Sequence, residues 1–523
     1  MTPLRCGVVC DHSHFKEVLL SSDNEAAHMR ISKSKFVAGL QCLKRLYWQV
    51  HEPELGAEAD AGNRAVLEQG EEVGRLARQL FPGGVEVEAD RENLGDAIRI
   101  TKELVRNPSV PAIFEGAFEH DGVFVRVDIL QRRDRKRWRL LEVKSTTDLK
   151  EHQLYDVGIQ SRVVARSGLK LSSSNLLHLN PDYVFQGGSF DLKQIFRVKN
   201  LNRELARLQP KLMNQLRSQF KVLRQSEPPD VAPGRQCRKP VLCEFFDCCN
   251  PSYPSDHVGS LPRIQAEAVE ELRAQGVDLI RDIPEDFPLS ERQQRARASV
   301  TTGKPWCNPD LGKNLEALKY PICYMDFETV NPAIPRFPGM HPFMCIPFQW
   351  SVHRLENATA VPRHFEFLAE DRSDPRLPFL EALLRAVDGA GTIVVYNQTF
   401  ESGRLAELAE WAPKYRNKIA NIQKKVWDLL ACVRTNIYHP DFQGSFTLKR
   451  VLPALVPDMS YENMEVGNGA EASLAWEKML GLEAGSEAKR KLRNSLLEYC
   501  RQDSLAMLRL VEVLRRFAVE IPG

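Results

Sequence analysis

Two apolar, strand-like stretches, far apart in the chain, carry charged side chains at alternate positions. The first holds Glu142 beside Lys144, and the second holds Asp326 and Glu328. Because side chains alternate across a strand, each pair projects from one face while its apolar neighbours project from the other. Two neighbouring carboxylates on a strand favour a metal ion. The sequence therefore predicts two α/β domains, each with a polar site on its sheet.

The length and composition are those of a multidomain globular protein. The chain has 523 residues, which suggests roughly two to four domains. Hydrophobic residues make up 43% and charged residues 27%, and no apolar run is long enough to cross a bilayer. Residues 1–28 lack the basic start and apolar stretch of a secretory signal. We therefore expect a soluble, cytoplasmic protein with no membrane partner.

Composition shifts divide the chain into four segments. We expect a tail without assigned function at 1–28, a first α/β domain at 29–255, a helical connector at 256–318 and a second α/β domain at 319–520. The connector holds amphipathic pieces and no cluster of catalytic residues.

The first site is expected on a β-hairpin. Residues 122–130 alternate like a strand, and a polar turn leads to a second strand at 138–144. Asp128 on the first strand can reach the place where Glu142 and Lys144 project. Two carboxylates can hold a divalent cation, and the lysine can steady an attacking water or a phosphate oxygen. The alternative without a function is a chance salt bridge on an exposed strand pair.

The order of these residues resembles the Asp…Glu-x-Lys pattern of the PD-(D/E)XK nucleases, whose fold is restriction-endonuclease-like. The resemblance implies Mg²⁺ or Mn²⁺ as cofactor and places Glu115 at the family's upstream acidic position. It also makes Gln160, on the helix after the hairpin, the glutamine typical of RecB-type members. The tyrosine that follows this glutamine in the family is replaced by Val164, and the family's N-terminal histidine has no clear counterpart.

Four of the twelve cysteines have an arrangement that suggests a metal cluster. Cys42 stands alone, whereas Cys237, Cys243 and Cys249 follow a Cys-x5-Cys-x5-Cys spacing. Zinc sites usually pair closer ligands, so this set better suits a [4Fe-4S] cluster. Such a cluster would be a staple that joins the two ends of the first domain. One cysteine before and three after the nuclease core resembles the iron-sulfur nucleases of the Cas-four and AddB type.

The formal net charge is only +2, so any binding to nucleic acid must come from local basic patches. One candidate patch is the turn of the hairpin, where Trp138 offers an aromatic ring for stacking. An ordinary solvated hairpin tip explains the same charges equally well. The basic residues of this turn are Arg132, Arg133, Arg135, Lys136 and Arg137.

The second domain offers four carboxylates and a phenol. Asp326 and Glu328 share one face of a strand, and Glu401 lies in the first turn of a later helix. Tyr499 and Asp503 are four residues apart and share a face of the C-terminal helix. Four carboxylates can bind two divalent ions roughly 4 Å apart, and Tyr499 would orient the attacking water.

These three motifs resemble the DEDDy exonucleases of the DnaQ, ribonuclease-H-like fold. In the usual pattern the second motif ends in Asp, whereas this chain has the longer Glu401. The whole arrangement resembles an uncharacterised bacterial family, that of the domain of unknown function 2779, which fuses an iron-sulfur RecB-like domain to a DnaQ-like domain. The fold class expected is therefore α/β, with a PD-(D/E)XK domain, an iron-sulfur staple, a helical connector and a ribonuclease-H-like domain.

The resemblance implies metal-dependent hydrolysis of phosphodiester bonds. We expect DNA as the partner, single-stranded or at ends, in repair, recombination or defence, with 3′ to 5′ polarity at the C-terminal site. Two alternatives stay open: a nucleic-acid-binding scaffold whose sites have lost catalysis, and an RNA-trimming exonuclease. The sequence leaves protein partners unknown.

Overall fold

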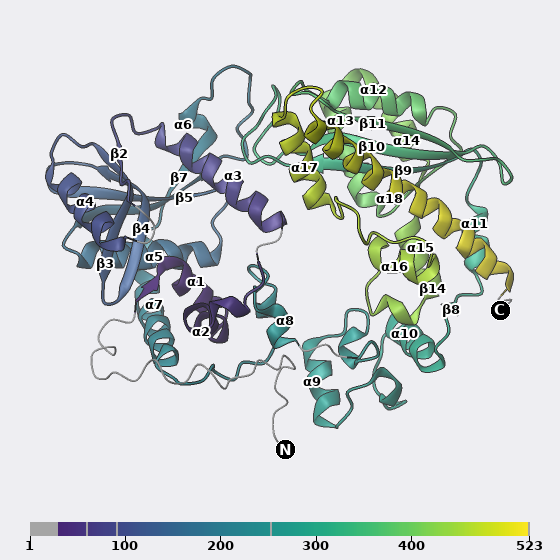
Figure 1. Ribbon diagram of the computed structural model, residues 1–523, viewed down its shortest axis with the longest axis horizontal. Helices are drawn as coiled ribbons and strands as arrows, with labels where there is room; N and C mark the ends of the chain where they lie inside the picture. The colour runs from purple at the N-terminus through teal and green to yellow at the C-terminus, as the bar shows by residue number, and fades with distance from the viewer. Residues whose placement is uncertain (1–29, 59–60, 90–92, 251–253, 521–523) are drawn as a thin grey trace. The chain divides into compact units, whose positions relative to one another are not determined.

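The structure is a computed structural model that describes residues 30–58, 61–89, 93–250 and 254–520. The expected tail at 1–28 lies outside these residues. Both parts of the chain combine helices with β-sheets, which confirms the α/β class (Figure 1).

The chain divides into two compact units. Unit 1 consists of Met1–Ser252 and Pro332–Phe343, and unit 2 consists of Tyr253–Asn331 and Met344–Gly523. Within the described residues, no helix has both the length and the apolar character needed to cross a membrane.

Unit 1 is built on a mixed seven-stranded sheet in the order β2-β3-β4-β5-β6-β7, with β1 beside β4. β3, β4 and β5 pair antiparallel, and β6 lies parallel to β5. The expected hairpin is confirmed as β4 and β5, with Ile129 opposite Leu141. The strands are β1 (Ile31–Ser32), β2 (Val85–Glu86), β3 (Ala112–His120), β4 (Val123–Arg132), β5 (Arg137–Lys144), β6 (Lys170–Leu179) and β7 (Phe196–Asn200).

Helices cover both faces of this sheet. Leu140 packs among residues of α5 and α7, whereas Leu141 packs among residues of α3, so successive side chains of β5 enter opposite cores. Glu142 shares the face of Leu140 and therefore points toward α5. The helices are α1 (Lys33–Gln41), α2 (Leu43–His51), α3 (Ala61–Arg78), α4 (Leu94–Arg106), α5 (Glu151–Arg166), α6 (Leu192–Ile195), α7 (Asn202–Leu223) and α8 (Phe246–Cys249).

Unit 2 is built on a five-stranded sheet in the order β11-β10-β9-β12-β13. β9, β10 and β11 pair antiparallel, whereas β12 and β13 run parallel to β9. A separate two-stranded ladder joins β8 to β14. The strands are β8 (Trp306–Cys307), β9 (Ile322–Val330), β10 (Ile346–Leu355), β11 (Arg363–Leu368), β12 (Thr392–Val395), β13 (Val426–Asp428) and β14 (Ile437–Tyr438).

The two faces of this sheet bury different helices. Met325 and Phe327 of β9 pack among residues of α12, α13 and α14, whereas Ile322 and Tyr324 pack among residues of α18, which contacts β9 and β10 (Figure 1). Asp326, in register with Tyr324, therefore faces α18. The helices are α9 (Ala266–Ala274), α10 (Glu291–Thr302), α11 (Leu311–Glu316), α12 (Arg376–Ala386), α13 (Gln398–Trp411), α14 (Arg416–Gln423), α15 (Leu429–Asn436), α16 (Leu448–Leu455), α17 (Gly469–Gly481) and α18 (Glu487–Glu520).

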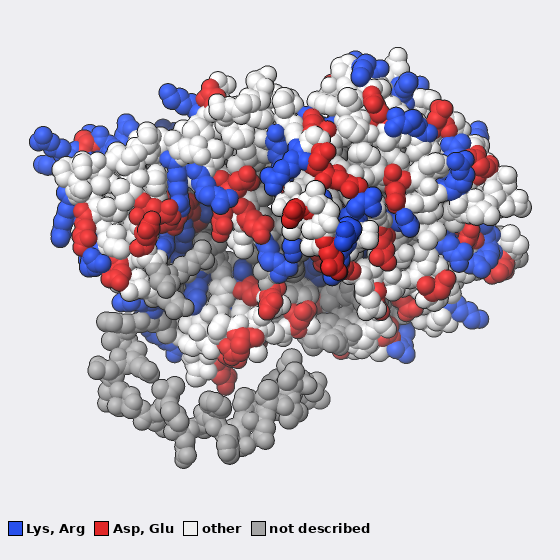
Figure 2. Space-filling model, turned by 45° about the horizontal axis from the view of Figure 1, so that its top comes forward, with Lys and Arg blue, Asp and Glu red and all other residues white. Residues whose placement is uncertain are grey.

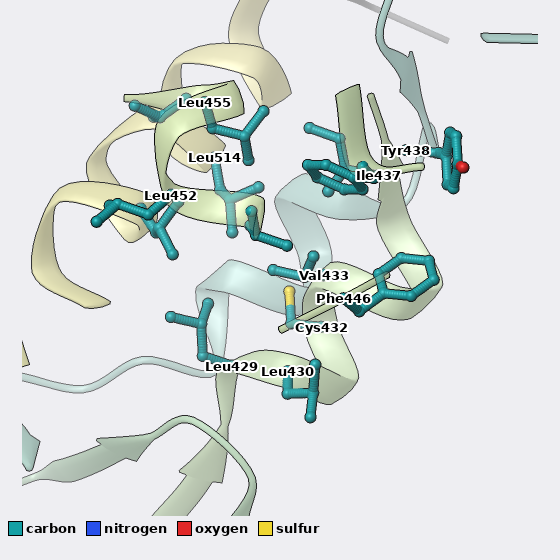
Figure 3. Close-up of a cluster of buried hydrophobic side chains, with 14 of the residues drawn as sticks. Leu429, Leu430, Cys432, Val433, Ile437, Tyr438, Phe446, Leu452, Leu455 and Leu514 are labelled. Carbon is teal, nitrogen blue, oxygen red and sulfur yellow. The ribbon is translucent and has the colours of Figure 1, made fainter. Parts of the chain in front are cut away.

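The stretch expected as a connector, 256–318, packs within unit 2. Leu272 from this stretch is buried in the same hydrophobic cluster as residues of α15, α16 and α18. Figure 3 shows part of this cluster, in which Val433, Leu452 and Leu514 come from those three helices. A different segment, Pro332–Phe343, leaves unit 2 between β9 and β10 and is part of unit 1.

Candidate functional site

Three carboxylates converge in unit 2. Asp326 and Glu328 project from β9 toward α18, whose middle carries Asp503. Each side chain offers one oxygen, and these three atoms lie within 4.8 Å of one another. Over the described ranges, no other group of three or more Asp, Glu, His or Cys side chains meets that test. The fold therefore assembles two of the expected motifs into one compact set of metal-ligating atoms.

The charge of this acidic set is only partly opposed, because the ammonium of Lys449 lies near Glu328 and Asp503 without forming an ion pair with them. Among the described residues, none of the three carboxylates forms an ion pair with Lys, Arg or His. Burial, reinforced by Asp503 and Glu328, holds the pKa of Asp326 well above its ordinary value. Burial also raises the pKa of Glu328 and lifts that of Asp503 to about 6. A divalent cation would favour the ionised carboxylates and so oppose these shifts.

Glu401 lies close to this set and is itself incompletely bonded. It is only 2% exposed, and its Oε2 atom has no hydrogen-bond partner in the described structure. Burial, with a smaller contribution from Asp428, raises its pKa to about 8. Its charge also raises the pKa of Asp326 and Glu328, although it lies outside the group of three. An unpartnered buried carboxylate oxygen beside three others fits a metal ligand.

The start of α13 explains how Glu401 is aimed. Asn397 precedes the helix with a φ of 96°, in the left-handed region that few residues adopt. Asp428 accepts hydrogen bonds from the backbone N–H groups of Asn397 and Ala431, at 3.3 and 3.2 Å, and so caps α15 while it holds this bend. Asp428 is therefore a positioning residue for the first turn of α13.

Two further side chains join the unit 2 site from outside the expected motifs. Tyr461 donates a hydrogen bond to Oδ1 of Asp503. The ammonium of Lys449 lies 5.6 and 5.7 Å from the ring centroids of Tyr461 and Tyr499. Tyr499, as expected, lies beside Asp503, and burial raises its pKa so that the phenol stays protonated. No spacing in the sequence marks Lys449 or Tyr461, because only the packing of their segment on α18 brings them here.

The expected residues of unit 1 also meet, but with internal counter-charges. Lys144 donates 2.7 Å hydrogen bonds to Glu142 and to Asp156, and Gln160 donates to the same two carboxylates at 2.7 and 2.8 Å. Lys33, from the start of α1, lies 3.5 Å from Oδ1 of Asp128. Lys33 is a member of this group that the sequence did not mark, whereas Asp156 lies four residues before Gln160 on α5 and shares its helical face, so that the spacing already pointed to it.

Glu142 is fully bonded by these neighbours. It is 1% exposed, and Lys33 donates to both of its oxygens, at 3.0 and 3.2 Å, in addition to Lys144 and Gln160. Each carboxylate oxygen accepts about two hydrogen bonds, so all four positions are used. Burial alone would lower the pKa of Lys33, but Asp128 and Glu142 outweigh it and raise that pKa. The ammonium of Lys33 thus neutralises the carboxylates that a metal would need.

Glu115 does not share in this group. Its Oε1 accepts a 2.9 Å hydrogen bond from Arg78, which also pairs with Glu86 at 2.7 Å. Asp128 is held by the backbone N–H of Val143, which donates to its Oδ2 at 2.7 Å. Within the described residues, Glu115, Asp128 and Glu142 form no set of ligand atoms as compact as that of unit 2.

The four predicted cluster cysteines gather at the edge of unit 1. The pKa of Cys249 is raised to about 11, mainly by burial, and Cys237, Cys243 and Cys42 are near enough to contribute to this rise. Gln41, next to Cys42, donates to the carbonyl oxygens of Gln236 and Val241 at 2.7 and 2.8 Å, which ties the two ends together. Cys248 is directed elsewhere, because its thiol contacts the carbonyl oxygen of Leu55 at 3.4 Å.

The basic turn of the hairpin is partly used by the protein itself. Arg132 donates to the carbonyl oxygens at the end of α4 and lies 4.1 Å over the ring of Trp138. Trp138 is 2% exposed, so the expectation that it stacks on a base is wrong. Arg137 is exposed and pairs with Asp134 at 2.6 Å. Arg133, Arg135 and Lys136 are also exposed. Figure 2 shows Lys and Arg interspersed with Asp and Glu over the visible surface.

The sites therefore define a two-unit α/β protein with a buried acidic cluster on the sheet of unit 2. Residues 323–447 match the family described as Domain of unknown function (DUF2779). The chain is also similar to the Uncharacterized protein UU173 of Ureaplasma parvum serovar 3, with 25% identity over 173 residues. That alignment covers 29% of this chain and 25% of the relative, so the chain spans about a quarter of the curated protein that it matches.

The raised pKa values of the unit 2 carboxyls predict a pH-dependent stability without metal. The folded state holds these protons more tightly than the unfolded state, so their contribution is present at acidic pH and is lost as pH rises from about 4 to about 8. In EDTA, the free energy of unfolding measured by urea denaturation should fall over this range by about a few kcal/mol. Glu401→Gln should lose less, because the amide does not titrate, whereas the exposed control Glu462→Gln should behave like wild type. Equal losses in wild type and Glu401→Gln would refute the assignment.

The two acidic groups should differ in their affinity for Mn²⁺. We expect Mn²⁺ binding, measured by calorimetry on the full chain, to be lost in Asp326→Asn and unchanged in Asp128→Asn, because Lys33 already neutralises the carboxylates of unit 1. Lys33→Met should add a second class of bound Mn²⁺. The expectation would be contradicted if Asp326→Asn still bound Mn²⁺ and if that binding disappeared when Asp128 was replaced as well.

Proposed function

We propose that the protein is a metal-dependent nuclease whose unit 2 hydrolyses phosphodiester bonds of nucleic acid. The observation that carries this proposal is the buried set Asp326, Glu328 and Asp503, together with the unpartnered oxygen of Glu401. Four buried acidic side chains with only the ammonium of Lys449 to oppose their charge in the described structure are costly unless further cations join them. Oxygen ligands of this kind favour Mg²⁺ or Mn²⁺ over softer metals.

The topology of unit 2 supports the same proposal. Its strand order, with three antiparallel strands followed by two parallel ones, is the order expected if the sheet is ribonuclease-H-like and so supports the proposal. Acidic residues on the first strand, on the helix after the fourth strand and on the last helix match the order of the DEDDy exonuclease motifs. The match to a family of unknown function covers residues 323–447 and assigns no activity.

Each side chain of the site has a chemical task in this proposal. Asp326, Glu328, Glu401 and Asp503 would hold the metal, which would lower the pKa of a water molecule and offset charge on the phosphoryl oxygens. Tyr499, kept protonated by burial, would donate a hydrogen bond that orients the attacking water.

Lys449 and Tyr461 extend this set. Burial lowers the pKa of Lys449 while Asp503 and Glu328 oppose that shift, so its ammonium is close to both carboxylates. It is also the cation best placed to contact a non-bridging phosphate oxygen. Tyr461, through its hydrogen bond, fixes the orientation of Asp503.

Unit 1 has a different part in the proposal. Its order β3-β4-β5-α5-β6 and its residues Asp128, Glu142 and Lys144 support a PD-(D/E)XK ancestry. The donor set does not fit a divalent cation in this arrangement, because Glu142 has no free lone pair and Lys33 lies beside Asp128. We therefore assign cleavage to unit 2.

We further propose that Cys42, Cys237, Cys243 and Cys249 hold a [4Fe-4S] cluster. A single zinc ion, with bonds of about 2.3 Å to sulfur, would bring four thiolates within about 4 Å of one another. No three of these thiols lie that close together among the described residues. A backbone N–H of Gly234 points at Sγ of Cys237 at 3.4 Å, a contact that favours a charged sulfur. The wider spacing suits a cluster of several irons.

Cleavage assays on two matched variants test the proposed function. Wild type with Mn²⁺ should degrade end-labelled single-stranded DNA, and Asp326→Asn should be slower by about 100-fold or more, because it removes a metal ligand. Asp128→Asn should retain the activity. Labels at either end report the polarity, and an RNA of the same sequence separates the DNA from the RNA alternative.

The opposite results have clear meanings. If Asp128→Asn abolishes cutting and Asp326→Asn does not, the active site lies in unit 1. If wild type cuts neither DNA nor RNA, the scaffold alternative replaces the nuclease.

Metal analysis tests the cluster. Anaerobically purified wild type should contain about four irons and as many sulfides per chain, and Cys243→Ser should lose them. Cys248→Ser is the matched control and should retain its iron, because that thiol contacts Leu55 instead. Stoichiometric zinc in place of iron would refute the cluster.

A further inference from the structure

Beside the acidic cluster, unit 2 contains a cavity of about 480 Å³ whose charged lining is entirely basic. Arg263 and Arg292 come from the stretch expected as a connector, and Arg434 comes from α15. Tyr396, at the end of β12, and Phe446, before α16, form part of the remaining wall. A cavity of this size is large enough for one nucleotide unit.

Arg292 is repelled by Arg263 and Arg434, and the part of the chain that the structure describes gives these three arginines no acidic partner. Burial lowers the pKa of Arg292, and Arg263 and Arg434 are close enough to lower it further. Within the described ranges, none of the three donates to a carboxylate or forms an ion pair. Arginines that are clustered without a counter-charge cost folding free energy, so an anion that joins them would be bound favourably. Planar guanidinium groups match the oxygens of a phosphate.

The walls of the cavity are held firmly before any ligand arrives. Gly444 has a φ of 76°, and a Cβ atom there would lie 2.4 Å from the carbonyl oxygen of Ser260. Only glycine therefore allows the segment before Arg263 to approach this turn. The hydroxyl of Tyr438 accepts a 2.9 Å hydrogen bond from the backbone N–H of Gly444. The hydroxyl of Tyr396 donates to the carbonyl oxygen of Phe446 at 2.7 Å and joins two walls.

The cavity and the acidic cluster share two structural elements. Asn397 lines the cavity and precedes α13, whose first turn carries Glu401. Leu448 also lines the cavity, and the next residue, Lys449, lies close to Asp503. A strand bound at one of these places would therefore continue directly to the other.

We propose that the arginine pocket, formed by Arg263, Arg292 and Arg434, binds a backbone phosphate of the nucleic acid strand whose neighbouring phosphodiester is cleaved at the acidic cluster. This inference rests on the proposed function, since it names how the same site holds its substrate. The pocket supplies the positive charge that attracts the strand, while the acidic cluster requires a cation before it accepts a phosphate. Recognition of a phosphate is independent of base sequence.

Binding of a labelled oligothymidylate to the full chain, in EDTA and without turnover, tests the pocket. The double variant Arg292→Gln/Arg434→Gln should raise the dissociation constant about tenfold and lower the slope of log K against log salt by about one for each arginine. Arg385→Gln, at an exposed position on α12, is the matched control and should bind like wild type. Pyrophosphate should compete with the oligonucleotide on wild type and not on the double variant. Unchanged binding by the double variant, or an equal loss in the control, would overturn the proposal.

Two further measurements separate this proposal from its premises. The double variant should melt at the wild-type temperature or above, because it loses repulsion and no hydrogen bond to the protein. Mn²⁺-dependent hydrolysis of bis(p-nitrophenyl) phosphate, which is too small to reach both places, should need Asp326 and not the arginines. If this hydrolysis occurs but oligonucleotide binding is the same in wild type and the double variant, the pocket proposal is wrong and the nuclease proposal is unaffected. If arginine-dependent binding occurs without any hydrolysis, the nuclease proposal fails and the pocket stands.

Discussion

Buried negative charge on one face of the unit 2 sheet is the constraint on which the candidate site depends. Alternation along β9 sends Asp326 and Glu328 toward α18, and the same helix returns Asp503 to them. Hydrophobic packing around these residues is close enough that water cannot solvate the carboxylates fully, so their pKa values rise. Within the described residues this is the one compact group of metal-ligating atoms, which is why the proposed cation site is placed here.

Unit 1 shows that the same kinds of residue can be balanced in the opposite way. Asp128 and Glu142 stand on neighbouring strands as a nuclease motif requires, yet Lys33 and Lys144 supply the positive charge from within the protein. The hydrogen bond from Gln160 occupies the remaining acceptor position of Glu142. The two units differ in the charge balance around their carboxylates and in whether carboxylate lone pairs remain free, and not in the residue types of their motifs.

Attraction of a polyanion to an acidic site needs positive charge nearby. The net charge of +2 supplies no general attraction. In unit 2 the required charge is local, because Arg263, Arg292 and Arg434 line one cavity, and Lys449, next to the cavity-lining Leu448, lies close to Asp503. This distribution suits a strand of phosphates that passes from the basic pocket to the acidic cluster.

Local periodicity determined much of this protein from the sequence alone. The strands that carry Glu142 and Asp326, the helical spacing of Tyr499 and Asp503 and the α/β class all follow from alternation and helical repeat, which are properties of neighbouring residues. Lys33, Lys449 and the arginine pocket did not follow, because no local spacing links these residues to the side chains that packing brings beside them. The sequence likewise left open which acidic group is free to bind a metal. Only the tertiary structure decided that, since charge balance in a buried site depends on every side chain packed around it.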